Sequence, residues 1–308
     1  MRRVVLVLMA VVLIMLCSCE LSMKAPEVGK VHILVYGNDY AYDPDHRLNA
    51  TINDAVQVGR ALSHLSEKSK LTYDATYIYG LDHSLDETID TPHTIIGDIT
   101  YDSLVSELEN LALRAEPGDM TFLFFSGHGS SIYKGKVVDY GTDTASGSYF
   151  WTRDSSNLSK NSPIEIPVIM GLIEAIPGAK VVFSDFCYSG AFVRADYVSV
   201  TGSEYKSMEA TELFKCRTLI NESSSTFYLS AARYNEESHE SGNHGHFTKA
   251  LLQALGWNEY SGSLYVGGAW KDNRITFSEV AIYATKNDKD GQTPMYSGGS
   301  NDLVLFSF

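Results

Sequence analysis

The chain has 308 residues, of which 44% are hydrophobic, so it is long enough to bury a large core in one or two domains. Its formal net charge is −14 at pH 7 and its sequence pI is about 5.0. An acidic chain of this kind argues against nucleic acid as a partner, because binding a phosphate backbone needs a basic surface.

The first residues have the composition of a targeting signal. Two arginines precede thirteen apolar residues, Val4 to Leu16, a run too short to favour a membrane-spanning helix. The run ends in Leu16-Cys17-Ser18-Cys19, which resembles the site at which bacterial lipoproteins are cleaved before a cysteine that then carries lipid. We expect residues 1–18 to be a signal peptide, Cys19 to be lipidated, and residues 19–30 to be a tether. An exported lipoprotein of the cell membrane or outer membrane would result. The alternatives are an uncleaved anchor and an ordinary secretory signal.

Strand and helix patterns alternate along the rest of the chain. Apolar runs bounded by turn residues predict strands at Val31–Tyr36, Tyr73–Tyr79, Thr121–Phe125, Val181–Phe183, Phe227–Ser230 and Leu303–Phe306. Apolar residues at helical spacing predict helices that begin at Asn53-Asp54 and that span Tyr101–Ala115, Val168–Ile176, Gly245–Leu255 and Ile275–Tyr283. This alternation predicts an α/β fold with a mostly parallel six-stranded sheet and helices on both faces.

Two long polar segments interrupt the pattern. Residues 130–163 hold three aspartates, Asp139, Asp143 and Asp154, and long segments of this kind are usually functional or mobile. Residues 194–225 carry four basic residues among serines and glutamates and have the composition of an exposed linker.

Two predicted strands end in reactive side chains. Ser126-Gly-His-Gly129 places His128 between two glycines just beyond one strand, and Asp185-Phe-Cys-Tyr-Ser-Gly190 places Cys187 just beyond another. In an open parallel sheet, ligands bind at the carboxyl ends of the strands. A lone histidine or cysteine is usually structural. A cysteine and a histidine that both lie at strand ends can act together, with the thiol as nucleophile and the imidazole as its acid–base partner.

These two motifs, in this order, resemble those of the caspase-like cysteine peptidases, and the match is closer to metacaspases and their bacterial relatives. The resemblance extends from Asn53-Asp54 through Ser230-Ala-Ala-Arg233 to Gln292-Thr-Pro-Met295 and covers roughly residues 31–308. It implies a caspase-like αβα sandwich with one peptidase domain over residues 31–308. The segment at about 194–225 would separate parts like the large and small caspase subunits, and relatives are often cut there.

The resemblance implies a cysteine endopeptidase. Cys187 would be the nucleophile and His128 its acid–base partner, with the backbone N–H groups of Gly129 and Cys187 stabilising the oxyanion. Because a nucleophile must be free, we expect no disulfide between Cys187 and Cys216. This chemistry requires no cofactor and no metal. Metacaspases often bind calcium through aspartates, but the aspartates at 139, 143 and 154 do not match that pattern clearly, so calcium dependence stays open.

Substrate preference follows from the residues beside the two motifs. Asp185 lies two residues before Cys187, and Ser126 lies two residues before His128. Because side chains alternate between the two faces of a strand, each of them should point to the same side as the reactive side chain that follows it. In metacaspases the positions that resemble Asp54, Ser126 and Asp185 line a pocket for arginine or lysine. We therefore expect a protein or peptide substrate with a basic residue at the cleavage site. The alternative for Asp185 is a buried structural carboxylate.

Two other functions are compatible with this sequence. One is a caspase-fold surface binding module with weak or no peptidase activity, and the other is a different hydrolase or transferase on the same fold. The presence of both Cys187 and His128 favours the peptidase.

Overall fold

The computed structural model describes residues 29–80, 84–133, 136–137, 148–193, 225–270, 272–288, 291–298 and 302–308. The predictions for the signal peptide, for Cys19 and for the segment 194–224 lie outside these ranges, as do Cys216, Asp139 and Asp143.

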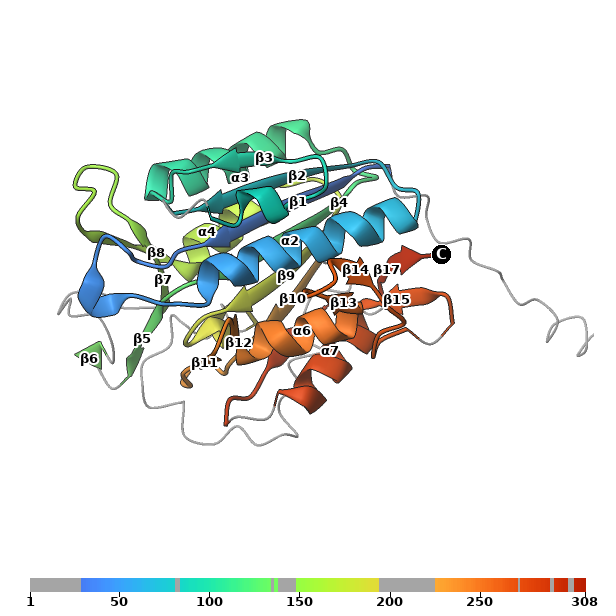
Figure 1. Ribbon diagram of the computed structural model, residues 1–308. Coiled ribbons are helices and arrows are strands. Elements are labelled where there is room, and N and C mark those ends of the chain that lie inside the picture. Colours follow the sequence, from blue (N-terminus) through green and yellow to red (C-terminus); the bar gives the residue numbers. More distant parts are fainter. Residues whose placement is uncertain are drawn as a thin grey trace, which may run out of the picture.

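A seven-stranded sheet forms the centre of the molecule, with the strand order β16-β10-β9-β4-β1-β2-β3 (Figure 1). Its strands are β1 (Val31–Gly37), β2 (Tyr73–Tyr79), β3 (Thr94–Ile96), β4 (Met120–Ser126), β9 (Ala179–Asp185), β10 (Thr226–Ser230) and β16 (Met295–Ser297). Neighbouring strands are parallel except β10 and β16, which are antiparallel. The predicted α/β class with a mostly parallel sheet is therefore confirmed.

The edges of the sheet differ from the sequence-based expectation. The expected strand at Leu303–Phe306 exists as β17 (Val304–Ser307), but it pairs with β15 (Arg274–Thr276) in a separate two-stranded sheet. The edge strands β3 and β16 have only three residues each, too few for apolar periodicity to reveal them.

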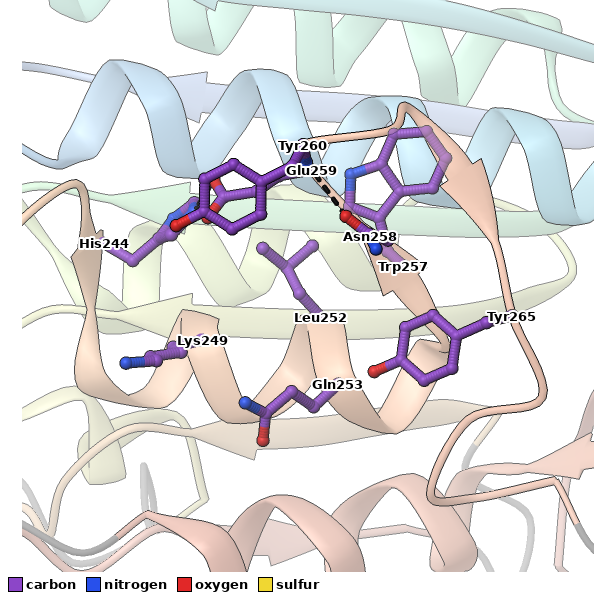
Figure 2. A pocket seen from close by; sticks show the side chains of 9 residues that line it. All are labelled: His244, Lys249, Leu252, Gln253, Trp257, Asn258, Glu259, Tyr260 and Tyr265. Atoms are coloured by element: carbon purple, nitrogen blue, oxygen red, sulfur yellow. Dashed lines mark hydrogen bonds and ion pairs between the residues drawn. The ribbon is translucent and has the colours of Figure 1, made fainter.

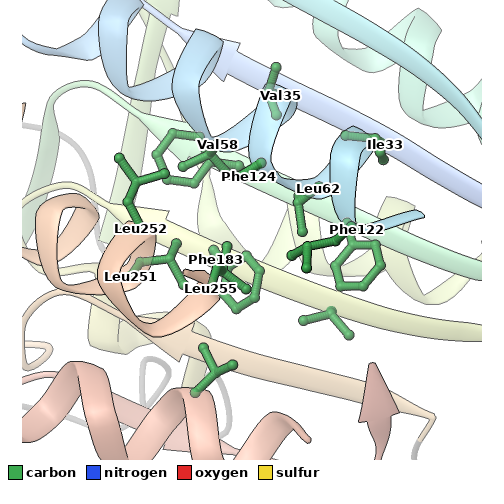
Figure 3. Packing of buried hydrophobic residues seen from close by; sticks show 14 of the residues in the cluster. Ile33, Val35, Val58, Leu62, Phe122, Phe124, Phe183, Leu251, Leu252 and Leu255 are labelled. Carbon is green, nitrogen blue, oxygen red and sulfur yellow. The ribbon is translucent and has the colours of Figure 1, made fainter. Parts of the chain in front are cut away.

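Helices cover both faces of the sheet because alternate residues of each strand point to opposite sides. On one face, Ile33 and Val35 of β1 join a core with α2 (Thr51–Lys68), α6 (His246–Leu255) and α7 (Phe277–Asn287). Figure 3 shows this core, in which side chains of α2 and α6 lie over Phe122 and Phe183.

On the other face, Leu34 and Tyr36 pack with α3 (Tyr101–Arg114) and α4 (Ile166–Glu174). No helix in the described part of the chain combines the length and the apolar composition needed to cross a membrane.

Four helices begin one or two residues away from the expected position, since α2 begins at Thr51 and α6 at His246. The starts of the other two have a local explanation. Helix α7 begins at Phe277 rather than Ile275, because Thr276 and Glu279 form a reciprocal capping box. Helix α4 begins at Ile166 rather than Val168, with a proline in its first turn, where proline is favoured.

The polar segment expected to be irregular contains a second sheet. The strands β5 (Gly129–Tyr133), β6 (Lys136–Val137), β7 (Ser148–Arg153) and β8 (Asn161–Glu165) form an antiparallel sheet in the order β6-β5-β7-β8. Its aromatic residues Tyr149, Phe150 and Trp151 are buried. The described part of this segment is therefore structural, and it begins directly after His128.

Several small elements complete the fold. The short 3-10 helices are η1 (Pro44–His46), η2 (Asp86–Thr88) and η3 (Ser189–Val193). Two short hairpins are formed by β11 (Glu240–Ser241) with β12 (His244–Gly245), and by β13 (Trp257–Asn258) with β14 (Ser263–Leu264).

Candidate active site

Register brings the residues singled out from the sequence to one edge of the sheet. Ser126 at the end of β4 pairs with Gly37 of β1 on one side and with Asp185 of β9 on the other. Because the three strands are parallel, their carboxyl ends lie level. His128 and Cys187 each follow two residues beyond this level and so leave the same edge.

Cys187 lies in a tight turn between β9 and η3. It is half-buried and forms no disulfide within the described ranges. Its Sγ lies 3.6 Å from the carbonyl oxygen of Ser238. The next residue, Tyr188, has a φ of 63°, an uncommon left-handed conformation, and its N–H donates to the Glu236 carbonyl at 2.8 Å. The segment after β10 therefore holds the cysteine turn in place.

His128 is held by Tyr40 and by the loop that contains η1. The backbone N–H of His128 donates to the Tyr40 hydroxyl at 2.8 Å, and that hydroxyl donates to the carbonyl of Trp151 at 2.7 Å. The two rings also pack, with centroids 4.5 Å apart. Nε2 of His128 lies 2.7 Å from the carbonyl oxygen of His46, which is only an acceptor. Nε2 therefore carries a proton, and Nδ1 is the basic nitrogen of the neutral ring.

Gly129 brings the histidine turn against the cysteine turn. A Cβ added to Gly129 would lie 2.0 Å from the carbonyl oxygen of Cys187 and 2.5 Å from the Phe186 ring, so only glycine fits. The two motifs that are far apart in the sequence are thus in backbone contact, next to the residues expected to react.

The three residues expected to line a substrate pocket also meet. Asp54 is buried in the first turn of α2, and its Oδ2 accepts a hydrogen bond from the Ser126 hydroxyl at 3.2 Å. Asp185 is 5% exposed, and its Oδ2 accepts from the backbone N–H of Thr248 at 3.0 Å and from the Thr248 hydroxyl at 2.6 Å. Burial, followed by the charge of Asp54, raises the pKa of Asp185 to about 8.

His244 belongs to the same cluster, and sequence reasoning missed it. The sequence showed only that His244 and His246 lack companions for a metal site. Nδ1 of His244 lies 2.7 Å from Asp54 Oδ1, and Nε2 lies 2.5 Å from Glu259 Oε2. Burial lowers the pKa of His244, but the hydrogen bonds and charges of Asp54 and Glu259 outweigh burial and raise it overall. No local pattern links His244 with Asp54, because only the fold joins positions so far apart.

A cavity of about 290 Å³ opens on the outer side of His244 (Figure 2). It lies over α6 and the β13–β14 hairpin, with Leu252 in its wall and Tyr260 and Tyr265 around it. The cavity is distinct from the turns that hold Cys187 and His128, and His244 lies between it and Asp54.

Within the described ranges, no group of three or more His, Cys, Asp or Glu side chains is arranged so that it could hold a metal ion. Asp154 is exposed and uses Oδ1 to accept from the backbone N–H groups of Ser156 and Asn157, as in an ordinary turn. The prediction that the chemistry requires no cofactor stays a prediction.

Comparison with known proteins identifies the architecture. Residues 30–266 match the family model of the caspase domain. Protein GSU0716 from Geobacter sulfurreducens has a similar structure, with a TM-score of 0.51 and 17% sequence identity over 91% of this chain and 97% of that one. Caspase-1 from Spodoptera frugiperda is also similar, with a TM-score of 0.52 and 11% identity over 93% of this chain and 92% of that one. No curated protein matches by sequence. The expected caspase-like fold is confirmed.

The hydroxyl of Tyr40 gives a test of how His128 is held. Replacing Tyr40 with Phe keeps the ring but removes the partner of two buried backbone groups, so we expect the free energy of unfolding to fall by about 1–3 kcal/mol. Tyr260→Phe is the control, because it removes a hydroxyl from a side chain that is 92% exposed. Chemical denaturation of both variants measures the difference, and equal stability would contradict this role of Tyr40.

Proposed function

The chain belongs to the caspase-domain family, whose members are cysteine peptidases, and from this premise we propose that it is an endopeptidase that cleaves after arginine or lysine. Cys187 is the nucleophile and His128 its acid–base partner. The observation that carries the proposal is the backbone contact between Gly129 and Cys187, which joins the two motif turns at one edge of the sheet.

The proposed reaction has two steps. Sγ of Cys187 bonds to the scissile carbonyl carbon and gives its proton to His128, and His128 delivers this proton to the leaving amine as the C–N bond breaks. Water then attacks the thioester, which releases the acid and restores the thiol. The His46 carbonyl supports this role because it accepts from the Nε2–H of His128, which makes Nδ1 the basic nitrogen of the neutral ring. The backbone N–H groups of Gly129 and Cys187 are the proposed donors to the oxyanion.

Buried carboxylates support the preference for a basic residue. Asp185 lies two residues before Cys187 on the same strand, so its side chain projects on the side of the thiol. Its Oδ1 accepts no hydrogen bond from any residue in the described ranges, whereas Oδ2 accepts two from Thr248. In a side chain that is only 5% exposed, a carboxylate oxygen without a donor is poorly solvated, and an arginine or lysine of the substrate would supply a donor.

We also propose that the domain is exported and held at a membrane of a bacterial cell by lipid on Cys19. The support is the sequence alone, namely the apolar run of residues 4–16 and the cysteine that follows it. Attachment through a lipid-modified cysteine with two or more acyl chains would be stable, whereas a single chain binds only reversibly.

The first prediction from this proposal concerns the reactive pair. Cys187→Ala and His128→Ala should each lower kcat/KM by about a thousand-fold or more, because catalytic residues that act as a unit have effects of that size. The assay is a matched panel of fluorogenic peptides that end in arginine, lysine or aspartate. Near-normal cleavage by Cys187→Ala would disprove the assignment. Wild-type protein that binds these peptides but cleaves none would favour the binding module.

A second prediction concerns the pocket. Asp185→Asn keeps an acceptor for Thr248 but removes the charge that the carboxylate carries above about pH 8. At about pH 9, kcat/KM for the arginine peptide should therefore fall at least tenfold, about 1.4 kcal/mol of transition-state binding. The rate at which iodoacetamide alkylates Cys187 should not change. Asp154→Asn, which alters an exposed carboxylate, is the control. Efficient wild-type cleavage after aspartate, or indifference to Asp185→Asn, would show that the pocket has been misread.

A third prediction concerns the N-terminus. Mass spectrometry of the protein purified from membranes should find a first residue Cys19 that carries diacylglycerol, and Cys19→Ser should move the protein out of the membrane fraction. An unmodified first residue at any other position would refute the lipoprotein proposal.

A further inference from the structure

His244 lies between two carboxylates that come from different elements. Its Nδ1 faces Asp54 Oδ1 on α2. Its Nε2 faces Glu259 Oε2 in the β13–β14 hairpin, and Figure 2 shows His244 and Glu259. The ring is 6% exposed, so water screens these contacts little. Asp54 and His244 share the proton between them, and the pair is neutral whichever of the two holds it.

Asp54 has little left to offer a substrate. Its Oδ1 accepts from His244, its Oδ2 accepts from the Ser126 hydroxyl, and the N–H of Gly245 lies 3.2–3.3 Å from both oxygens. Its charge is balanced by His244 and its lone pairs are used. Asp185 differs, because the described residues hydrogen-bond only its Oδ2.

We propose that His244 is a specificity-determining residue of the basic-residue pocket: it neutralises Asp54, so that Asp185 alone meets the cation of the substrate. The inference rests on the proposed preference for arginine or lysine. Asp54 and Asp185, which were expected to line the pocket together, then have different roles. His244, which lies outside the Cys187–His128 pair, acts on the specificity of the pocket.

A pH dependence follows from this division of roles. The charged groups around His244 are Asp54, Glu259 and Lys249, the last of these across the outer cavity. Beyond Asp54 lies Asp185, whose pKa is raised by burial, by the charge of Asp54 and by the charge of Asp288. The pKa of Asp185 is raised to about 8, so its carboxyl is neutral below that pH and ionised above it. A cation should therefore bind more tightly as the pH rises through about 8, because Asp185 gains its charge there.

Removal of His244 should abolish this dependence. Without the imidazole, Asp54 and Asp185 become two neighbouring carboxylates that hold one proton and one charge between them. A cation then meets a negative pocket even at low pH. His244→Gln should therefore strengthen binding of a basic side chain near about pH 6 and leave it little changed near about pH 9.

The experiment measures binding without catalysis. Full-length protein with Cys187→Ala is titrated calorimetrically with two peptides that span a cleavage site and differ only in arginine or uncharged citrulline at that position. With His244 present, the preference for arginine over citrulline should grow as the pH rises from about 6 to about 9. With His244→Gln, the preference at about pH 6 should be about tenfold larger and nearly constant with pH. Asp154→Asn, which alters a carboxylate in the turn after β7, should follow the parent protein.

The outcomes separate the inference from the proposed function. No preference for arginine over citrulline at any pH would refute the basic-residue pocket and the inference with it. A clear preference that His244→Gln leaves unchanged, or that Asp154→Asn alters as strongly as His244→Gln does, would overturn only the role of His244. If His244→Gln does not fold, His244→Asn replaces it. The parent protein also tests the inference alone, since a strong preference that is independent of pH would mean that a permanently ionised group meets the cation.

Discussion

The buried carboxylates of Asp54 and Asp185 impose the main electrostatic constraint on the carboxyl edge of the central sheet. Asp54 is 1% exposed and Asp185 is 5% exposed, and the charge of Asp54 contributes to the raised pKa of Asp185. Like charges in a dry environment repel, and burial penalises each charged form. The surrounding structure offsets this cost with donors, and most of these donors come from the start of α6.

The N-terminus of α6 suits this task for two reasons. The first N–H groups of a helix lack partners within the helix, and the helix dipole favours negative charge at that end. Gly245 and Thr248 donate to Asp54 and Asp185 respectively, and Gly245 is required because an added Cβ would lie 2.1 Å from Asp185 Oδ2. The carboxylates therefore attach α6 to α2 and β9. Asp185 can stabilise α6 and also take part in the proposed substrate binding, because Oδ2 accepts hydrogen bonds from Thr248 and Oδ1 does not.

Local patterns in the sequence predicted the strands that position the site and the sheet edge at which it lies. The apolar runs of β1, β4 and β9 and the glycines around His128 identified the strands and the edge from which both motif turns emerge. Periodicity did not reveal β3, β16 or the sheet that includes β7, because short strands with mixed composition lack a clear pattern. The contact between His244 and Asp54 was beyond such reasoning, since a single histidine at a helix start has many ordinary explanations and only the packing of α6 against α2 selects one.

The site also depends on both sides of the segment 194–224. Cys187 and Asp185 precede this segment, whereas Ser238, His244 and Thr248 follow it and contact the pocket or the cysteine turn. Strands β9 and β10 flank the segment and pair in parallel from Lys180–Thr226 to Ser184–Ser230. Residues of β10, α6 and α7 are buried in the same core as those of β1 and β4. A chain break between β9 and β10 would therefore leave two parts joined by a hydrogen-bonded ladder and a shared apolar core, so the geometry around Cys187 does not require a continuous chain there.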